Sequence, residues 1–178
     1  MIYKKSWKYI LIKGNLYSDP AYYVLKALKD FSDVSKGDLG GYIKGYHNLS
    51  QSGNCWAYNS ARINGYARVS DEAKVFDNTY ISGEAKIFGY AKVYGNAQIS
   101  ERSMVSEYAK VYGRAMILGK AKIYGNAIIC ESTEIYGNAK IFGEAKVGGD
   151  SIVCGDALVG GNARISGCDK VFGNDMII

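Results

Sequence analysis

The chain has 178 residues, with 22 Lys and Arg against 17 Asp and Glu, which gives a formal net charge of +5. This length suits a single domain, and the weak positive charge excludes a strongly acidic mimic of nucleic acid. No apolar run reaches the roughly 18 residues of a membrane-spanning helix, and the first apolar run is too short for a secretion signal. The sequence therefore predicts a cytoplasmic protein with no membrane partner.

Residues 1–50 are expected to form a small β cap and a lead-in. Residues 8–13 and 22–28 are rich in Tyr, Ile, Leu and Val and predict two strands, joined by a turn at Asp19 and Pro20. Residues 36–41 predict a loop. Because the open end of a stack of strands exposes unpaired backbone groups, a cap is needed there.

From residue 63 to residue 177 an Ile or Val occupies every sixth position without interruption. A small residue, mostly Ala, lies two positions before each, and Gly or an acid lies two positions after nearly all of them. This period fits neither a helix nor a simple strand, but it fits a short strand followed by a corner. Three such units close a triangular coil. The sequence thus predicts an all-β fold, a single-stranded parallel β-helix of about six to seven coils over residues 51–178.

The repeat resembles the left-handed β-helix of the hexapeptide-repeat superfamily, in which a small residue follows the aliphatic one four positions later, as Ala97 follows Val93. It departs from that pattern because Gly stands two positions after the aliphatic residue. A right-handed, bactofilin-like β-helix is the alternative. The lead-in, with GDLGGYI at 37–43 and NLSQSGNCW at 48–56, is similar to a group of uncharacterised phage and prophage proteins. That likeness implies a mobile-element origin, and hence a host cell's cytoplasm, but brings no established catalytic residues.

Every third unit shares a wall of the triangle, so wall one is defined by Ile63, wall two by Val69 and wall three by Val75, each with every eighteenth residue after it. The outer residues of wall one are apolar in its C-terminal half, and its inner small residues often depart from Ala. Both features predict a partner face, with a homo-oligomer expected and a trimer favoured. The candidates for this face are Tyr80, Met116, Leu118, Tyr136, Ile152 and Cys154.

Wall three predicts a row of outward lysines beside a row of aromatic rings. Such a face suits a nucleotide or nucleic acid, through phosphate contacts and stacking. The alternative is that the lysines prevent aggregation of an exposed sheet, while the rings only stabilise the ladder. Corner acids also offer local neutralisation of the rows: Glu72, Glu84, Glu107 and Glu144. The candidate anion-binding residues are Lys74, Lys92, Lys110, Tyr94 and Tyr112.

Acyltransferases of the hexapeptide-repeat superfamily resemble one another in using a His as general base. This chain has one His, His47 in the lead-in, and its uninterrupted period leaves no extruded loop to build a cleft. We therefore predict no catalytic residue, cofactor or metal site. The expected function is a scaffold that binds a host or phage protein, a nucleic-acid-processing factor or a small anionic ligand, including a counter-defence role. The alternatives are an acyl-CoA-dependent acyltransferase with His47 as its base and a bactofilin-like assembling protein.

Overall fold

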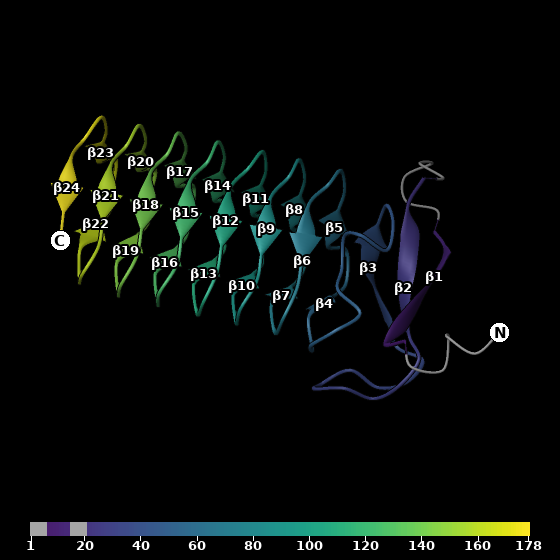
Figure 1. The fold of residues 1–178 in the computed structure, drawn as a ribbon. Helices are drawn as coiled ribbons and strands as arrows, with labels where there is room; N and C mark the ends of the chain where they lie inside the picture. The colour runs from purple at the N-terminus through teal and green to yellow at the C-terminus, as the bar shows by residue number, and fades with distance from the viewer. Residues whose placement is uncertain (1–6, 15–20) are drawn as a thin grey trace.

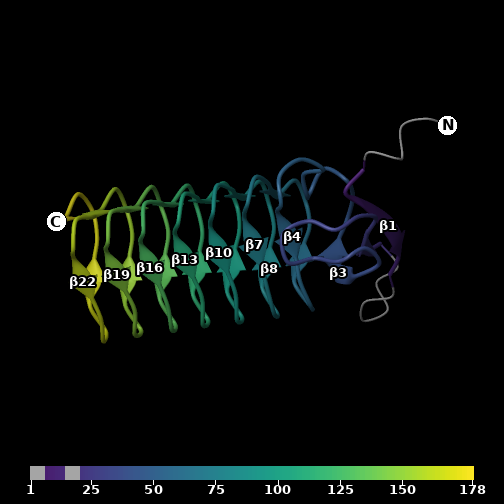
Figure 2. The same ribbon diagram turned by 90° about the horizontal axis from the view of Figure 1, so that it is seen from below.

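The computed structural model describes residues 7–14 and 21–178, which form a three-sided parallel β-helix with an antiparallel β cap at its N-terminal end (Figure 1). In that view each coil runs from wall one at the top, through wall two facing the viewer, to wall three below, while advancing away from the cap. Figure 2 shows wall three from below. This winding is left-handed, and the predicted all-β parallel β-helix is confirmed. The described residues contain no helix, and so none long and apolar enough to cross a membrane.

Each wall is an array of parallel strands whose paired residues lie eighteen positions apart, except that Ile43 on the first strand of wall one pairs with Ile63. Wall one contains β3 (Leu39–Ile43), β5 (Arg62–Ile63), β8 (Tyr80–Ile81), β11 (Gln98–Ile99), β14 (Met116–Ile117), β17 (Glu134–Ile135), β20 (Ile152–Val153) and β23 (Lys170–Val171). Wall two contains β6 (Arg68–Val69), β9 (Lys86–Ile87), β12 (Met104–Val105), β15 (Lys122–Ile123), β18 (Lys140–Ile141), β21 (Leu158–Val159) and β24 (Met176–Ile177). Wall three contains β4 (Trp56–Ala57), β7 (Lys74–Val75), β10 (Lys92–Val93), β13 (Lys110–Val111), β16 (Ile128–Ile129), β19 (Lys146–Val147) and β22 (Arg164–Ile165).

The core consists of the inner aliphatic and alanine columns of the three walls. Val111 and Ala109 are fully buried, whereas Lys110 between them is exposed. The same alternation recurs along the coils because successive side chains of a strand point to opposite faces. The side chains predicted to point outward therefore lie on the outer surfaces of the three walls.

The corners explain why either Gly or an acid follows each aliphatic residue. Most corner glycines have positive φ, and five acids adopt the same left-handed conformation, with φ between 57° and 60°. Each of these five carboxylates accepts the N–H of the corner glycine in the next coil, as Glu107 does from Gly125 at 3.0 Å. The acids thus offset the cost of a strained backbone with a charge-assisted hydrogen bond.

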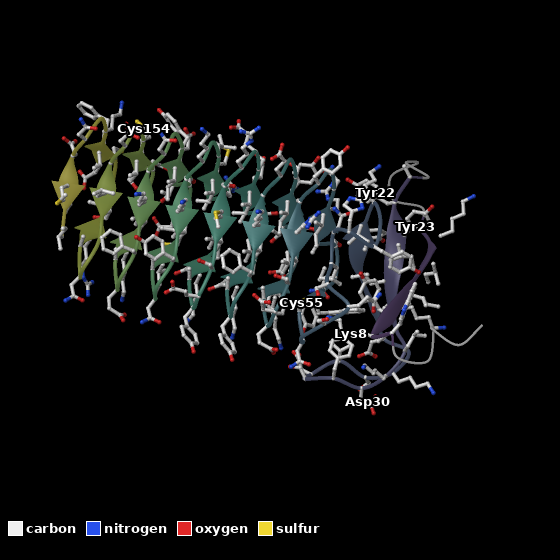
Figure 3. The ribbon with its side chains drawn as sticks, viewed as in Figure 1. Lys8, Tyr22, Tyr23, Asp30, Cys55 and Cys154 are labelled. Carbon is white, nitrogen blue, oxygen red and sulfur yellow. The ribbon has the colours of Figure 1, made fainter. Side chains whose placement is uncertain are left out.

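The cap is formed by β1 (Tyr9–Lys13) and β2 (Tyr23–Ala27), which pair antiparallel, and β2 in turn pairs with β3. Both predicted strands are confirmed, while the predicted turn at Asp19 and Pro20 lies outside the described residues. Figure 3 shows Lys8 beside Cys55, where the cap meets the first coil. The Lys8 side chain is buried and donates from Nζ to the backbone oxygen of Cys55 at 2.9 Å. This contact joins the cap to the solenoid.

The predicted loop at residues 36–41 is wrong for its last three residues, which belong to β3. Gly40 and Gly41 allow this because they lie against the first coil: a Cβ on Gly40 would lie 2.7 Å from Cζ2 of Trp56, and one on Gly41 would lie 2.5 Å from the oxygen of Ala61. The first coil therefore begins at β3. Wall one contains eight parallel strands, which mark about eight turns rather than the six to seven expected.

Candidate functional site

The lysine row of wall three is formed as predicted. Lys92 pairs in register with Lys74 and Lys110, so neighbouring lysines start about 4.8 Å apart. Lys74, next to the cap, forms an ion pair with Asp33 and also donates to Oγ of Ser32 at 3.2 Å. Lys92 and Lys110 have no carboxylate within ion-pair distance among the described residues. The unpaired positive charge in this part of wall three is therefore concentrated on two adjacent strands, which we call rungs of the sheet.

Stacked tyrosines flank these two rungs on both sides. Tyr94 and Tyr112 follow the lysines along their strands, with ring centroids 4.8 Å apart and planes 5° from parallel. Tyr90 and Tyr108 precede the lysines at the corner, with centroids 5.0 Å apart, and remain 54% and 57% exposed. A groove of about 680 Å³ runs between the lysines and the corner pair. This corner pair could not be predicted from strand alternation, which sorts only the strand positions.

The two tyrosines on the strands of wall three, Tyr94 and Tyr112, stay neutral well above physiological pH. Burial raises the pKa of Tyr94, and burial with a hydrogen bond to Cys130 raises the pKa of Tyr112. Their hydroxyl groups therefore add hydrogen-bond donors without negative charge. The face offers two cations between four tyrosine rings.

The corner acids do not form ion pairs with this row. Glu107 accepts a backbone N–H of the next corner, Glu72 accepts from Asn54 and Glu144 accepts from Asn126. Glu84 forms an ion pair, but with Arg102 at another corner. Glu72 and Glu144 nevertheless line the same groove as Lys92 and Lys110, so local neutralisation of the row by these acids stays a prediction.

The candidate partner face on wall one is not continuous, because a polar residue separates Tyr80 from the other candidates. Tyr80 lies near the cap, where its hydroxyl accepts a hydrogen bond from Asn64 at 2.7 Å, and Gln98 occupies the rung between Tyr80 and Met116. The apolar part begins only beyond that rung, where Tyr136 is the most exposed member. The face that remains contains Met116, Leu118, Tyr136, Ile152 and Cys154, the last of which is labelled in Figure 3.

The polar residues in the inner column of wall one have a local explanation. Thr79, Thr133 and Ser151 each donate their hydroxyl to the carbonyl three residues earlier, at 2.7–2.8 Å. Ser103 on wall two does the same, and the carboxylate of Asp169 accepts the N–H three residues earlier. These substitutions close corners, so they give no independent support to a partner face.

His47, the alternative catalytic residue, is exposed beside the cap. Its Nε2 lies 2.8 Å from the carbonyl oxygen of Gly65, and because a carbonyl only accepts, Nε2 carries the proton and Nδ1 is an acceptor in the neutral ring. No carboxylate orients this ring among the described residues. Over the same residues there is no group of three or more His, Cys, Asp and Glu that could hold a metal ion.

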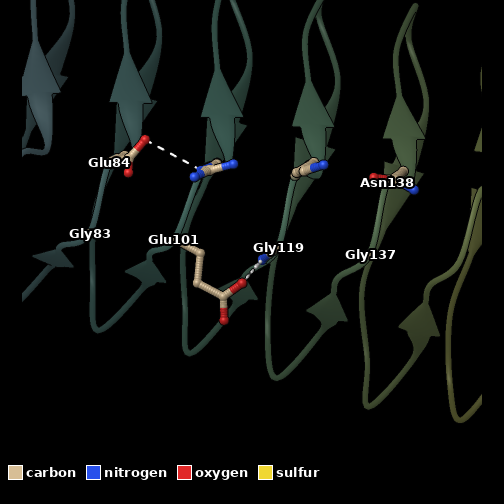
Figure 4. A pocket seen from close by; sticks show the side chains of 8 residues that line it. Gly83, Glu84, Glu101, Gly119, Gly137 and Asn138 are labelled. Carbon is tan, nitrogen blue, oxygen red and sulfur yellow. Dashed lines mark hydrogen bonds and ion pairs between the residues drawn. The ribbon is translucent and has the colours of Figure 1, made fainter.

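A further hollow of about 490 Å³ follows the corner between walls one and two (Figure 4). Three of its four charged groups have partners, and only Lys120 has none among the described residues. Glu84 lies 3.4 Å from Arg102, and Glu101 accepts the N–H of Gly119 at 2.9 Å. We therefore place the candidate site on wall three.

Comparison with models of known protein families gives no match, and comparison with curated proteins finds no related chain. The fold itself is a parallel β-solenoid, which is consistent with a superfamily of the hexapeptide-repeat type. Membership of the phage and prophage group remains a prediction from the lead-in motif.

Proposed function

We propose that this chain is a non-enzymatic binding protein that holds single-stranded nucleic acid on wall three. The observation that carries the proposal is the position of Lys92 and Lys110, unpaired and in register between two stacked tyrosine pairs. Phosphate contacts supply most of the affinity of such surfaces, and aromatic rings add stacking with bases of any sequence.

The shape of the face favours a single strand over a duplex. Reading a duplex requires a helix or ribbon that enters a groove of the DNA, and the strands of wall three that contain Lys92 and Lys110 belong to a flat sheet. A single strand can instead lie along the lysine row and turn its bases toward Tyr90 and Tyr108, whose rings are more than half exposed.

Wall two offers an internal comparison for the competing view, in which the lysines serve only solubility. Lys122 and Lys140 are also adjacent in register, and they too have a stacked pair beside them, Tyr124 and Phe142 at 5.4 Å. The corner side of these lysines has no tyrosine, since Lys120 and Asn138 take those positions. The two lysines are thus matched between the walls, while wall two has a further cation, Lys120, and the amide of Asn138 in place of the second ring pair.

The test is fluorescence anisotropy with a labelled single-stranded oligonucleotide. We expect the double substitution Lys92→Gln and Lys110→Gln to weaken binding at least about tenfold, and Lys122→Gln with Lys140→Gln to weaken it much less. Replacing Tyr90 with Ser should also weaken binding, by the loss of a base stack. Equal losses on the two walls, or equal binding of polyphosphate without bases, would reject the proposal.

A second proposal, self-association through wall one, rests on its apolar rungs. Leu118, Tyr136 and Cys154 lie on three successive coils and form an apolar strip, beside the column in which Glu134 separates Met116 from Ile152. Light scattering with size exclusion should give a discrete oligomer, with a trimer favoured, and Leu118→Lys should reduce it to a monomer. A wild-type chain that stays monomeric at high concentration removes this proposal.

Binding to a host or phage protein, acyl transfer by His47 and filament assembly remain predictions without a contact that favours them.

A further inference from the structure

A second hollow, of about 590 Å³, lies where the cap meets wall two, on a different face from the lysine row. Its walls are the turn at Tyr46 and His47 on one side and the first rungs of wall two on the other. Its size falls within the usual range for small-molecule sites. Neither the candidate anion-binding face nor the partner face includes it.

The groove contains unbalanced positive charge. Arg68 and Lys86 line it from adjacent rungs and pair in register, so that they start about 4.8 Å apart. No Asp or Glu lines the groove, and neither cation has an ion-pair partner among the described residues. Two like charges at this spacing repel each other, and an anion bound between them would relieve the repulsion.

The groove also contains a ring that lacks a stacking partner. On this wall Tyr124 stacks with Phe142, but Phe88 has Ser70 on the rung before it and Ser106 on the rung after it, and no ring stacks on it among the described residues. A rung of the aromatic ladder is therefore missing beside Phe88.

The open face of Phe88 is the one toward the cap. Phe142 in this column leans toward the following coil, since a Cβ on Gly160 would lie 2.3 Å from its Cζ. By the same lean Phe88 covers Ser106, which is only 8% exposed and does not line the groove. Ser70 does line it, so the free face of the ring looks over Ser70 into the groove.

Cations and ring are spaced for one ligand. Arg68 and Ser70 are two residues apart on one strand, which separates the charged position from the ring slot by about 6.6 Å. We propose that this groove binds a mononucleotide, with its phosphate on Arg68 and Lys86 and its base stacked on Phe88 above Ser70. The ribose spans the strand between them, and His47, held by the carbonyl of Gly65, closes the side toward the cap.

The proposal is tested by isothermal titration of the full chain with AMP, adenosine and ribose 5-phosphate. AMP should bind, and the two fragments should each bind at least about tenfold more weakly, because each lacks one of the two contacts. Phe88→Ser and Arg68→Gln should each weaken AMP binding to a similar extent. The control Lys122→Gln, a cation of the same column outside the groove, should leave it unchanged.

Ser70→Tyr gives the sharpest variant, because it fills the missing rung with a protein ring. It should abolish AMP binding while the melting temperature stays the same or rises, which separates occupation of the slot from loss of fold. No binding of AMP at millimolar concentration, unchanged binding by Ser70→Tyr, or ribose 5-phosphate binding as tightly as AMP would each overturn the proposal. Lys92→Gln with Lys110→Gln should leave AMP binding intact, so this inference and the proposed function can fail separately.

Discussion

A pair of glycine substitutions measures how closely the coils are stacked. Gly113 and Gly167 are both corner residues, with φ of +75° and +66°. A Cβ on Gly113 would lie 2.7 Å from the backbone nitrogen of Glu131 in the next coil, whereas a Cβ on Gly167 meets nothing within 4 Å. Alanine at either site must adopt an unfavourable left-handed conformation, which costs about 1–2 kcal/mol of stability. A smaller stabilisation offsets part of this cost, because alanine lowers the conformational entropy of the unfolded chain.

Only Gly113→Ala also requires the next coil to move. The backbone of Glu131 cannot rotate away as a side chain could, and its displacement strains the hydrogen bond from the N–H of Arg114 to the oxygen of Glu131. Overpacking of this kind costs about 1–3 kcal/mol more. We expect a loss of about 2–4 kcal/mol for Gly113→Ala and about 1 kcal/mol for Gly167→Ala, measured by urea unfolding followed by circular dichroism. Equal losses at the two sites would refute the close stacking of corners.

Two further predictions concern the core and the loss of stability at acidic pH. Val111→Asp should prevent folding or cost more than about 4 kcal/mol, since it buries an unpaired charge. Tyr112→Ser should cost only about 1 kcal/mol in the same urea assay. Similar losses at the two sites would contradict the assignment of Val111 to the core and Tyr112 to the surface. Burial alone would raise the pKa of Asp33, but hydrogen bonds from Lys74 and Tyr58 outweigh it and lower that pKa to about 2. Because the folded pKa lies below the unfolded value of 3.8, the stabilisation is complete above that pH and is lost as the pH falls through about 2. Asp33 is half exposed, so the effect should stay below about 1 kcal/mol, and Asp33→Asn should remove it from an acid titration of the melting temperature; an unchanged titration would show that this carboxylate is not the group responsible.

The period of the repeat was enough to predict the solenoid and the face on which each outer side chain lies. An Ile or Val at every sixth position places Lys92 and Lys110 on one wall because strand alternation and a fixed coil length leave no other arrangement. The same logic missed Tyr90 and Tyr108, since the direction of a corner side chain depends on the turn conformation rather than on alternation.

The cap and its groove could not be predicted in this way. Lys8 meets Cys55 across 47 residues, and His47 reaches Gly65 from a lead-in that has no period. The strand at β3 was missed for a related reason: its two glycines are typical of loops, and the benefit of lacking a side chain there becomes visible only once Trp56 and Ala61 are in place. Contacts between aperiodic and periodic segments thus required the structure.

The salt dependence of oligonucleotide binding tests the central claim most directly. Each phosphate contact made by a single strand contributes about 0.7 to the slope of log affinity against log salt concentration. Removing the charges of Lys92 and Lys110 should therefore reduce that slope by about 1.4, while removing those of Lys122 and Lys140 should leave it nearly unchanged. An unchanged slope in the Lys92 and Lys110 variant would contradict the account, because it would show that no phosphate lies on wall three.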